Sequence, residues 1–122
     1  FFVQATSPLI KKEDLDNAYK KFKKEKKDSL FSGYEDFSFI WRKTNSNFKS
    51  INYNYKFRPR RQNFQSNIIE NGAFYIFKIK KFLKYKNRLF DKIGFYKMPK
   101  YRSFEIDEKH DWQFVKNIIN KI

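Results

Sequence analysis

The chain has 122 residues, the length of one ordinary domain, and 40% of them are hydrophobic, which is enough for a core of normal size. It contains no cysteine, which excludes a disulfide framework and a thiolate metal site. No apolar run approaches the ~18 residues of a membrane-spanning helix, and no signal peptide is visible. The sequence therefore predicts a cytoplasmic protein without a membrane partner.

The charge balance is strongly basic, with 28 Lys and Arg against 13 Asp and Glu, a formal net charge of +15. A basic surface with interleaved aromatic residues is typical of nucleic-acid binders. Lysine, asparagine, isoleucine, phenylalanine and tyrosine share A/T-rich codons, however, so genomic base bias explains this composition without a polyanionic partner. A small basic nucleic-acid-binding module is thus the alternative, and the favoured interpretation has no nucleic-acid partner.

The N-terminal third predicts a strand end, a helix and a strand. Residues 1–3 read as the end of a buried strand, so we expect a fragment whose N-terminal part is absent. Glu13 and Asp14 favour a helix N-terminus through the helix dipole. One apolar helix face at helical spacing follows, made of Leu15, Ala18, Tyr19 and Phe22. A short strand is expected within residues 28–35.

The remaining chain alternates between extended and helical patterns, which points to an α/β fold. Residues 36–67 are polar and aromatic, alternate near residues 51–57, and predict a hairpin or extended arm. The other predicted elements are a buried strand at 71–77, a helix at 78–90, a short extended segment from residue 94, an acidic strand at 103–107 and an amphipathic helix at 108–122.

The acidic segment "SFEID" is unusual in so basic a chain. In a strand, Ile106 points into the core while Glu105 and Asp107 lie side by side on the other face. Two carboxylates on one face repel each other unless a cation lies between them, and Mg²⁺ prefers such hard oxygen ligands. The alternative is a solvated strand-to-helix turn, with Asp111 near the start of the last helix.

Several short motifs occur in a characteristic order: "QATSPL" (4–9), "DSLFS" (28–32), "RRQ" (60–62), "NGAFYIF" (71–77), "MP" (98–99) and "SFEIDEKHD" (103–111). Together they resemble the C-terminal portion of the acylneuraminate cytidylyltransferase family. The resemblance implies an enzyme that transfers CMP from CTP to a nine-carbon keto-sugar acid and releases pyrophosphate. It also implies Mg²⁺, a three-layer α/β/α nucleotidyltransferase (Rossmann-like) fold, here partial, and a homodimer with a protruding arm.

The resemblance also implies roles for individual residues. Glu105 and Asp107 would bind the metal, with Asp107 and Arg61 as catalytic residues and Arg61 reaching the partner's site from the arm at about 36–67. Contacts to the sugar acid would come from Gln4, Ser7, Asn71, Gly72, Tyr75, Leu89 and Phe90. Read without the resemblance, Tyr75, Leu89 and Phe90 are plain core residues, and Arg61 lies in a solvated basic loop.

The three glycines are isolated, so no phosphate-cradling loop for CTP can be built from them. We therefore expect residues 1–122 to be the C-terminal part of one cytidylyltransferase domain that lacks its CTP-binding part. The isolated chain is expected to be inactive. The remaining alternative is a truncated, non-catalytic remnant.

Overall fold

The computed structural model describes residues 1–121, which divide into two compact units. The first unit comprises residues 1–34 and the described residues from 69 onward, and the second comprises residues 35–68. No helix within residues 1–121 is long and apolar enough to cross a lipid bilayer.

The first unit is built on a four-stranded sheet with the strand order β1-β5-β2-β6. Its strands are β1 (Phe2–Val3), β2 (Ser29–Asp36), β5 (Asn67–Phe77) and β6 (Ile93–Lys97). β1 pairs antiparallel with β5, whereas β2 pairs parallel with β6, so the sheet is mixed. A mixed α/β architecture is thus confirmed, and the three-layer nucleotidyltransferase arrangement stays a prediction.

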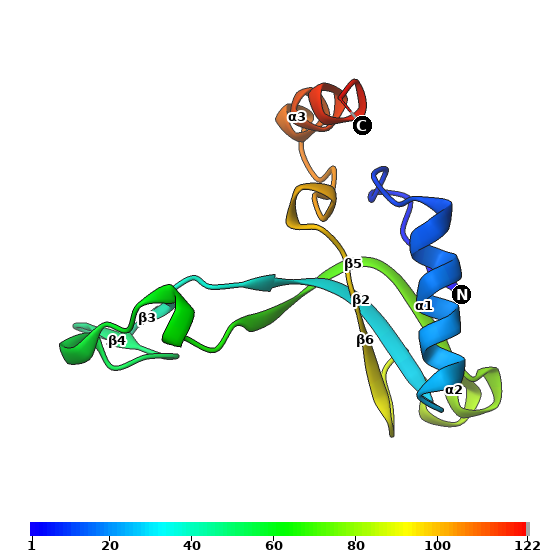
Figure 1. Ribbon diagram of the computed structural model, residues 1–122, viewed down its shortest axis with the longest axis horizontal. Coiled ribbons are helices and arrows are strands. Elements are labelled where there is room, and N and C mark those ends of the chain that lie inside the picture. Colours follow the sequence, from blue (N-terminus) through cyan, green and yellow to red (C-terminus); the bar gives the residue numbers. More distant parts are fainter. Residues whose placement is uncertain (122) are drawn as a thin grey trace. The chain divides into compact units, whose positions relative to one another are not determined.

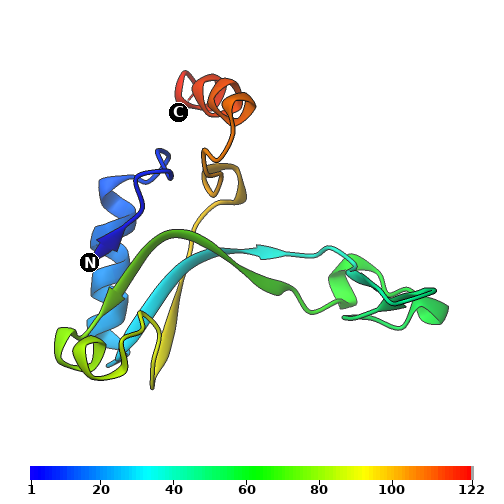
Figure 2. The same ribbon diagram turned by 180° about the vertical axis from the view of Figure 1, so that it is seen from behind.

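Helix α1 (Lys12–Lys24) lies along this sheet in both views (Figures 1 and 2). Its Ala18 and Phe22 pack into a core with Leu30, Phe74 and Met98. The buried helix face is narrower than the sequence predicts, because Tyr19 is 46% exposed and packs against the ring of Phe1.

Two predicted elements are corrected by the structure. The helix expected at 78–90 is only α2 (Ile79–Tyr85), because Lys86 adopts a left-handed conformation and its N–H caps the carbonyl of Phe82. Residues 103–107 are not a strand. After β6 the chain passes Pro99, which has no N–H to donate, and turns through a 3₁₀ turn, η3 (Lys100–Arg102), away from the sheet.

The last helix, α3 (Lys109–Ile119), confirms the predicted amphipathic helix, with Val115 buried and Trp112 half exposed. The side chain of Asp111 caps the start of this helix by accepting hydrogen bonds from the N–H groups of Asp107 (3.0 Å) and Glu108 (2.8 Å). These bonds lower the pKa of Asp111. Asp111 therefore lies in the first turn of α3, where the alternative interpretation of the acidic segment placed it.

The second unit contains a short antiparallel hairpin of β3 (Trp41–Lys43) and β4 (Phe48–Ser50). Two 3₁₀ turns follow, η1 (Tyr55–Phe57) and η2 (Arg61–Asn63). A hairpin is thus present in this region, but the alternation near 51–57 does not form a strand. Asn54 instead caps η1, accepting a hydrogen bond from the N–H of Lys56.

Candidate functional site

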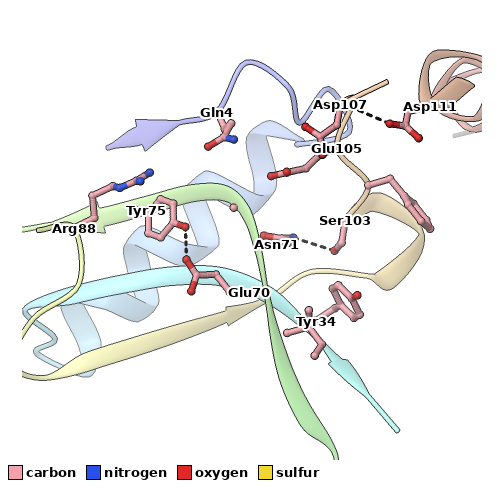
Figure 3. A pocket seen from close by; sticks show the side chains of 13 residues that line it. Gln4, Tyr34, Glu70, Asn71, Tyr75, Arg88, Ser103, Glu105, Asp107 and Asp111 are labelled. Atoms are coloured by element: carbon pink, nitrogen blue, oxygen red, sulfur yellow. Dashed lines mark hydrogen bonds between the residues drawn. The ribbon is translucent and has the colours of Figure 1, made fainter. Parts of the chain in front are cut away.

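A pocket of about 770 Å³ lies within the first unit (Figure 3). Five separate parts of the chain form it: the loop after β1, β2, β5, the loop between α2 and β6, and the segment that leads from β6 into α3. Its lining residues are Gln4, Tyr34, Ile69, Glu70, Asn71, Gly72, Tyr75, Arg88, Ser103, Phe104, Glu105, Asp107 and Asp111.

The pocket brings together six of the residues that the sequence analysis assigned to a site: Gln4, Asn71, Gly72, Tyr75, Glu105 and Asp107. Ser7, in the loop after β1, is buried and does not line the pocket. Leu89 and Phe90 do not line it either; Phe90 is buried and stacks on Tyr85 at 5.5 Å. Arg61 belongs to the second unit, where its guanidinium lies 4.6 Å from the centre of the Phe37 ring.

A buried ion pair joins α1 to the segment that carries the acidic residues of the pocket. The guanidinium of Arg102, at the end of η3, donates to both carboxylate oxygens of Asp14 on α1, with an Nη2 to Oδ1 distance of 3.0 Å. It also donates to the carbonyl of Leu9 (3.2 Å), which ends the loop that follows β1. One more bond, from the N–H of Ile106 to the carbonyl of Thr6 (2.8 Å), fastens the acidic segment to the same loop.

Asn71 acts as a structural link at the floor of the pocket. Its Oδ1 accepts hydrogen bonds from the hydroxyl of Ser32 (2.7 Å) and the N–H of Ala73 (3.2 Å). Its Nδ2 donates to the hydroxyl of Ser103 (3.0 Å) and contacts the sulfur of Met98 (3.4 Å). Since both ends of this buried amide are used within the protein, Asn71 ties β5 to β2 and to the acidic segment.

Glu105 and Asp107 share the pocket although their segment is not a strand. Partial burial raises the pKa of Glu105, and the neighbouring charge of Asp107 raises it further. Ser7 opposes this rise: its buried hydroxyl lies close to Glu105, yet makes no hydrogen bond of ordinary geometry. The nearby charge of Asp107 therefore disfavours the charged form of Glu105, an effect that a bound cation would relieve.

The remaining acidic residue nearby, Asp111, is engaged in starting α3, so Glu105 and Asp107 form the carboxylate pair. Within residues 1–121, no group of three or more His, Cys, Asp or Glu side chains is arranged to hold a metal ion. A pair of carboxylates is a donor set that Mg²⁺ commonly takes, completing its shell with water and phosphate oxygens, and Mg²⁺ at this pair stays a prediction.

A glycine at position 72 is favoured by its backbone conformation and by the close approach of a side chain. Its φ is +65°, and a Cβ built on it would lie only 2.5 Å from Oε1 of Glu105. A side chain at this position would therefore strain the backbone and push Glu105 aside. The close approach explains why a glycine lies between Asn71 and the buried part of β5.

Gly72→Ala is expected to lower the free energy of unfolding by about 1–2 kcal/mol, the cost of a left-handed backbone for an L-residue. Urea denaturation followed by circular dichroism measures this loss. Gly94→Ala is an unsuitable control because its Cβ would contact Lys27 and Leu30. Lys109→Ala, on the exposed first turn of α3, is suitable. An unchanged stability of Gly72→Ala would contradict the geometry described here.

The phenol of Tyr75 donates a hydrogen bond to the carboxylate of Glu70. Burial, reinforced by this bond and by the charge of Glu70, raises the pKa of Tyr75 to about 12. Because the pKa is raised in the folded protein, the unfolded chain loses this proton first as the pH increases. The stability that Tyr75 contributes is complete below pH 10 and is lost between pH 10 and 12.

We expect the wild-type protein to lose about 1 kcal/mol more stability than Tyr75→Phe between about pH 9 and about pH 11. Urea denaturation of both proteins at the two pH values gives the difference. The comparison cancels the other titrating groups, which both proteins share. Equal pH slopes for the two proteins would show that Tyr75 ionises normally.

Sequence reasoning missed two arginines that shape the site. Arg102 is buried in the ion pair with Asp14, and Arg88 lines the pocket with its guanidinium over the rings of Phe2 and Tyr75. Neither residue belongs to a local pattern, because each depends on partners far away in the sequence. The only sequence signal for Arg88 was its position directly before the Leu89–Phe90 pair.

Comparison with known proteins identifies relatives of the chain. N-acylneuraminate cytidylyltransferases B and A of Danio rerio are each 32% identical to it over 114 residues, which is 90% of this chain. The resemblance to the acylneuraminate cytidylyltransferase family is confirmed. The chain corresponds to only 27% and 26% of the length of these two cytidylyltransferases, and no family model matches it.

Proposed function

We propose that the protein carrying this chain transfers CMP from CTP to the anomeric hydroxyl of a nine-carbon keto-sugar acid. The observation that supports this most is the pocket: residues implied by the resemblance come from distant segments and line one cavity. The similarity to two N-acylneuraminate cytidylyltransferases supports the same reaction class. In this reaction the sugar oxygen bonds to the α-phosphorus of CTP, the bond to pyrophosphate breaks, and the hydroxyl proton passes to water.

Glu105 and Asp107 would hold Mg²⁺ in the proposed enzyme. A bound Mg²⁺ neutralises charge on the reacting phosphate and lowers the pKa of the attacking hydroxyl. Asp107, which is exposed in the pocket, would face the phosphate, while the partly buried Glu105 sits against Gly72. Gln4 would orient the sugar, because its amide offers both a donor and an acceptor to hydroxyl groups.

The second unit, residues 35–68, is the proposed dimerisation arm. Arg61 on this arm would act as a catalytic residue in the partner subunit's site. Its guanidinium lies over the ring of Phe37 and the residue is exposed, so its N–H groups would be available to a carboxylate or phosphate. Binding of CTP would need residues outside this chain, since the chain spans about a quarter of the relatives' length.

Pyrophosphate release by the complete protein tests the proposal. The protein is incubated with CTP, Mg²⁺ and a panel of nine-carbon keto-sugar acids. We expect release that depends on one sugar acid, and none from residues 1–122 alone. A folded complete protein that releases no pyrophosphate with any of these sugars would contradict the proposed function.

A further inference from the structure

Positive charge is concentrated at one end of the first unit. Residues 20–28 and 78–86 contain eleven lysines and no arginine, against two acidic residues, Glu25 and Asp28. These two short stretches thus carry +9 of the formal net charge of +15. Codon bias explains why the chain is rich in lysine, but it does not explain why so many lysines meet at one place in the fold.

Asp28 joins the two stretches. Its carboxylate forms ion pairs with Lys78 (2.7 Å) and Lys81 (3.0 Å), and its backbone carbonyl accepts a hydrogen bond from the N–H of Lys78 (3.1 Å). Both views show the C-terminal end of α1 beside α2 (Figures 1 and 2). Residues 20–28 and 78–86 therefore lie together, and we call them the basic end.

A pocket of about 420 Å³ lies at the basic end. Two aromatic residues and four lysines line it: Tyr19, Phe22, Lys23, Lys26, Lys27 and Lys78. Two of these lysines have acidic partners, since Lys78 pairs with Asp28 and Lys27 lies 3.8 Å from Glu25. Lys23 and Lys26 are exposed, and neither has an acidic partner within residues 1–121. The pocket thus offers two free cations to a phosphate-bearing anion.

Apolar side chains are also exposed at the basic end. Ile79 and Leu83 lie four residues apart on one face of α2 and are 62% and 55% exposed. Exposed aliphatic residues among lysines are typical of protein surfaces that bind anionic membranes. Nucleic-acid binders instead use aromatic rings for base stacking and arginine for bidentate phosphate contacts. Two exposed aliphatic residues and the lack of arginine therefore favour a bilayer.

We propose that the basic end binds the surface of an anionic lipid bilayer. Its lysines would attract the negatively charged headgroups, while Ile79 and Leu83 would enter the boundary between headgroups and acyl chains. A contact at the surface needs no membrane-spanning helix, and it would replace the expectation of a protein without a membrane partner. The proposal does not depend on the proposed function.

The basic end lies away from the candidate functional site. α1 begins at Lys12, close to the pair of Asp14 and Arg102 that positions the acidic segment, and it ends at Lys24 in the basic end. Its 13 residues span about 20 Å at a rise of about 1.5 Å per residue. A bilayer at the basic end would thus leave the carboxylate pocket open to its substrates.

Cosedimentation of the complete protein with lipid vesicles tests the proposal. The vesicles contain phosphatidylcholine alone or phosphatidylcholine mixed with phosphatidylserine. We expect binding to the mixed vesicles only, and weaker binding at high salt because salt screens the charges. The double variant Lys23→Glu with Lys26→Glu should bind at least about tenfold more weakly. Ile79→Ser with Leu83→Ser should weaken binding several-fold, because it removes the apolar contact.

Lys109→Glu with Lys116→Glu is the matched control. It changes the net charge by the same amount at two exposed lysines of α3, outside the basic end. We expect this variant to bind mixed vesicles as wild type does. Circular dichroism verifies that each variant is folded, and the two double variants at the basic end test it independently because they change different residues.

Three results would overturn the proposal. The first is a folded wild-type protein that does not sediment with the mixed vesicles. The second is an equal loss of binding in the control variant, which would show that net charge alone matters. The third is binding of a single-stranded oligonucleotide but not of vesicles, which would make the basic end a nucleic-acid surface. None of these results affects the test of the proposed function, which measures pyrophosphate release.

Discussion

Replacing Asp14 with alanine is expected to lower the free energy of unfolding by about 3–5 kcal/mol, because the buried guanidinium of Arg102 would lose its counter-ion. Both side chains are at least nine-tenths buried, and the pair is hydrogen-bonded through both carboxylate oxygens. Asp14 also accepts hydrogen bonds from the N–H of Lys11 (2.9 Å) and the hydroxyl of Tyr96 (3.4 Å). The variant should therefore loosen α1 and the acidic segment together.

Urea denaturation of the variant beside Asp16→Ala measures this effect, since Asp16 is an exposed carboxylate on the same helix. Burial alone would raise the pKa of Asp14, but its hydrogen bonds, led by those from Arg102, lower it overall. The stability from Asp14 is therefore present above the unfolded value of 3.8 and disappears as the pH falls below it. A loss no larger than that of Asp16→Ala would show that the pair contributes little.

Asp107→Ala should lower the turnover of the complete protein about 100- to 1,000-fold, because loss of a metal-binding carboxylate removes several kcal/mol of transition-state stabilisation. Asp107 is exposed, so the change should leave the fold intact. Its backbone N–H, which bonds Asp111, is also retained in the variant. Steady-state kinetics at saturating CTP and sugar acid, with Mg²⁺ varied, measure the loss.

Glu108→Gln provides the matched control, since it neutralises the next carboxylate along the chain, which does not line the pocket. It should keep most of the activity and the same Mg²⁺ dependence. Wild-type turnover in Asp107→Ala, or an equal loss in both variants, would remove Asp107 from the proposed metal site.

Local sequence patterns predicted the elements that rely on nearby residues. The acidic first turn of α1 and the apolar run of β5 are examples. The signals for a helix start and for a buried strand both lie within a few consecutive residues. The pairing of Glu105 with Asp107 in one pocket was also predicted, although for a strand. In the structure both residues line the pocket, and the residue between them is held by the hydrogen bond from the N–H of Ile106 to the carbonyl of Thr6 in the loop of residues 4–9.

Long-range contacts could not be read from the sequence. Arg102 meets Asp14 across 88 positions, and this ion pair decides where the acidic segment lies. Tyr19 matched the helical spacing of an apolar face but packs against Phe1 at its edge. The hydrogen bonds of the Asn71 side-chain amide likewise depend on Ser32 and Ser103, which lie in two other segments of the chain.

The product of the reaction tests the central proposal most directly. The complete protein is incubated with CTP, Mg²⁺ and an N-acylated nine-carbon keto-sugar acid, and the mixture is followed by phosphorus NMR. We predict a new phosphodiester signal from CMP linked to the sugar, growing in equal amount with pyrophosphate. Consumption of CTP without this phosphodiester, or no consumption by a folded protein, would contradict the account.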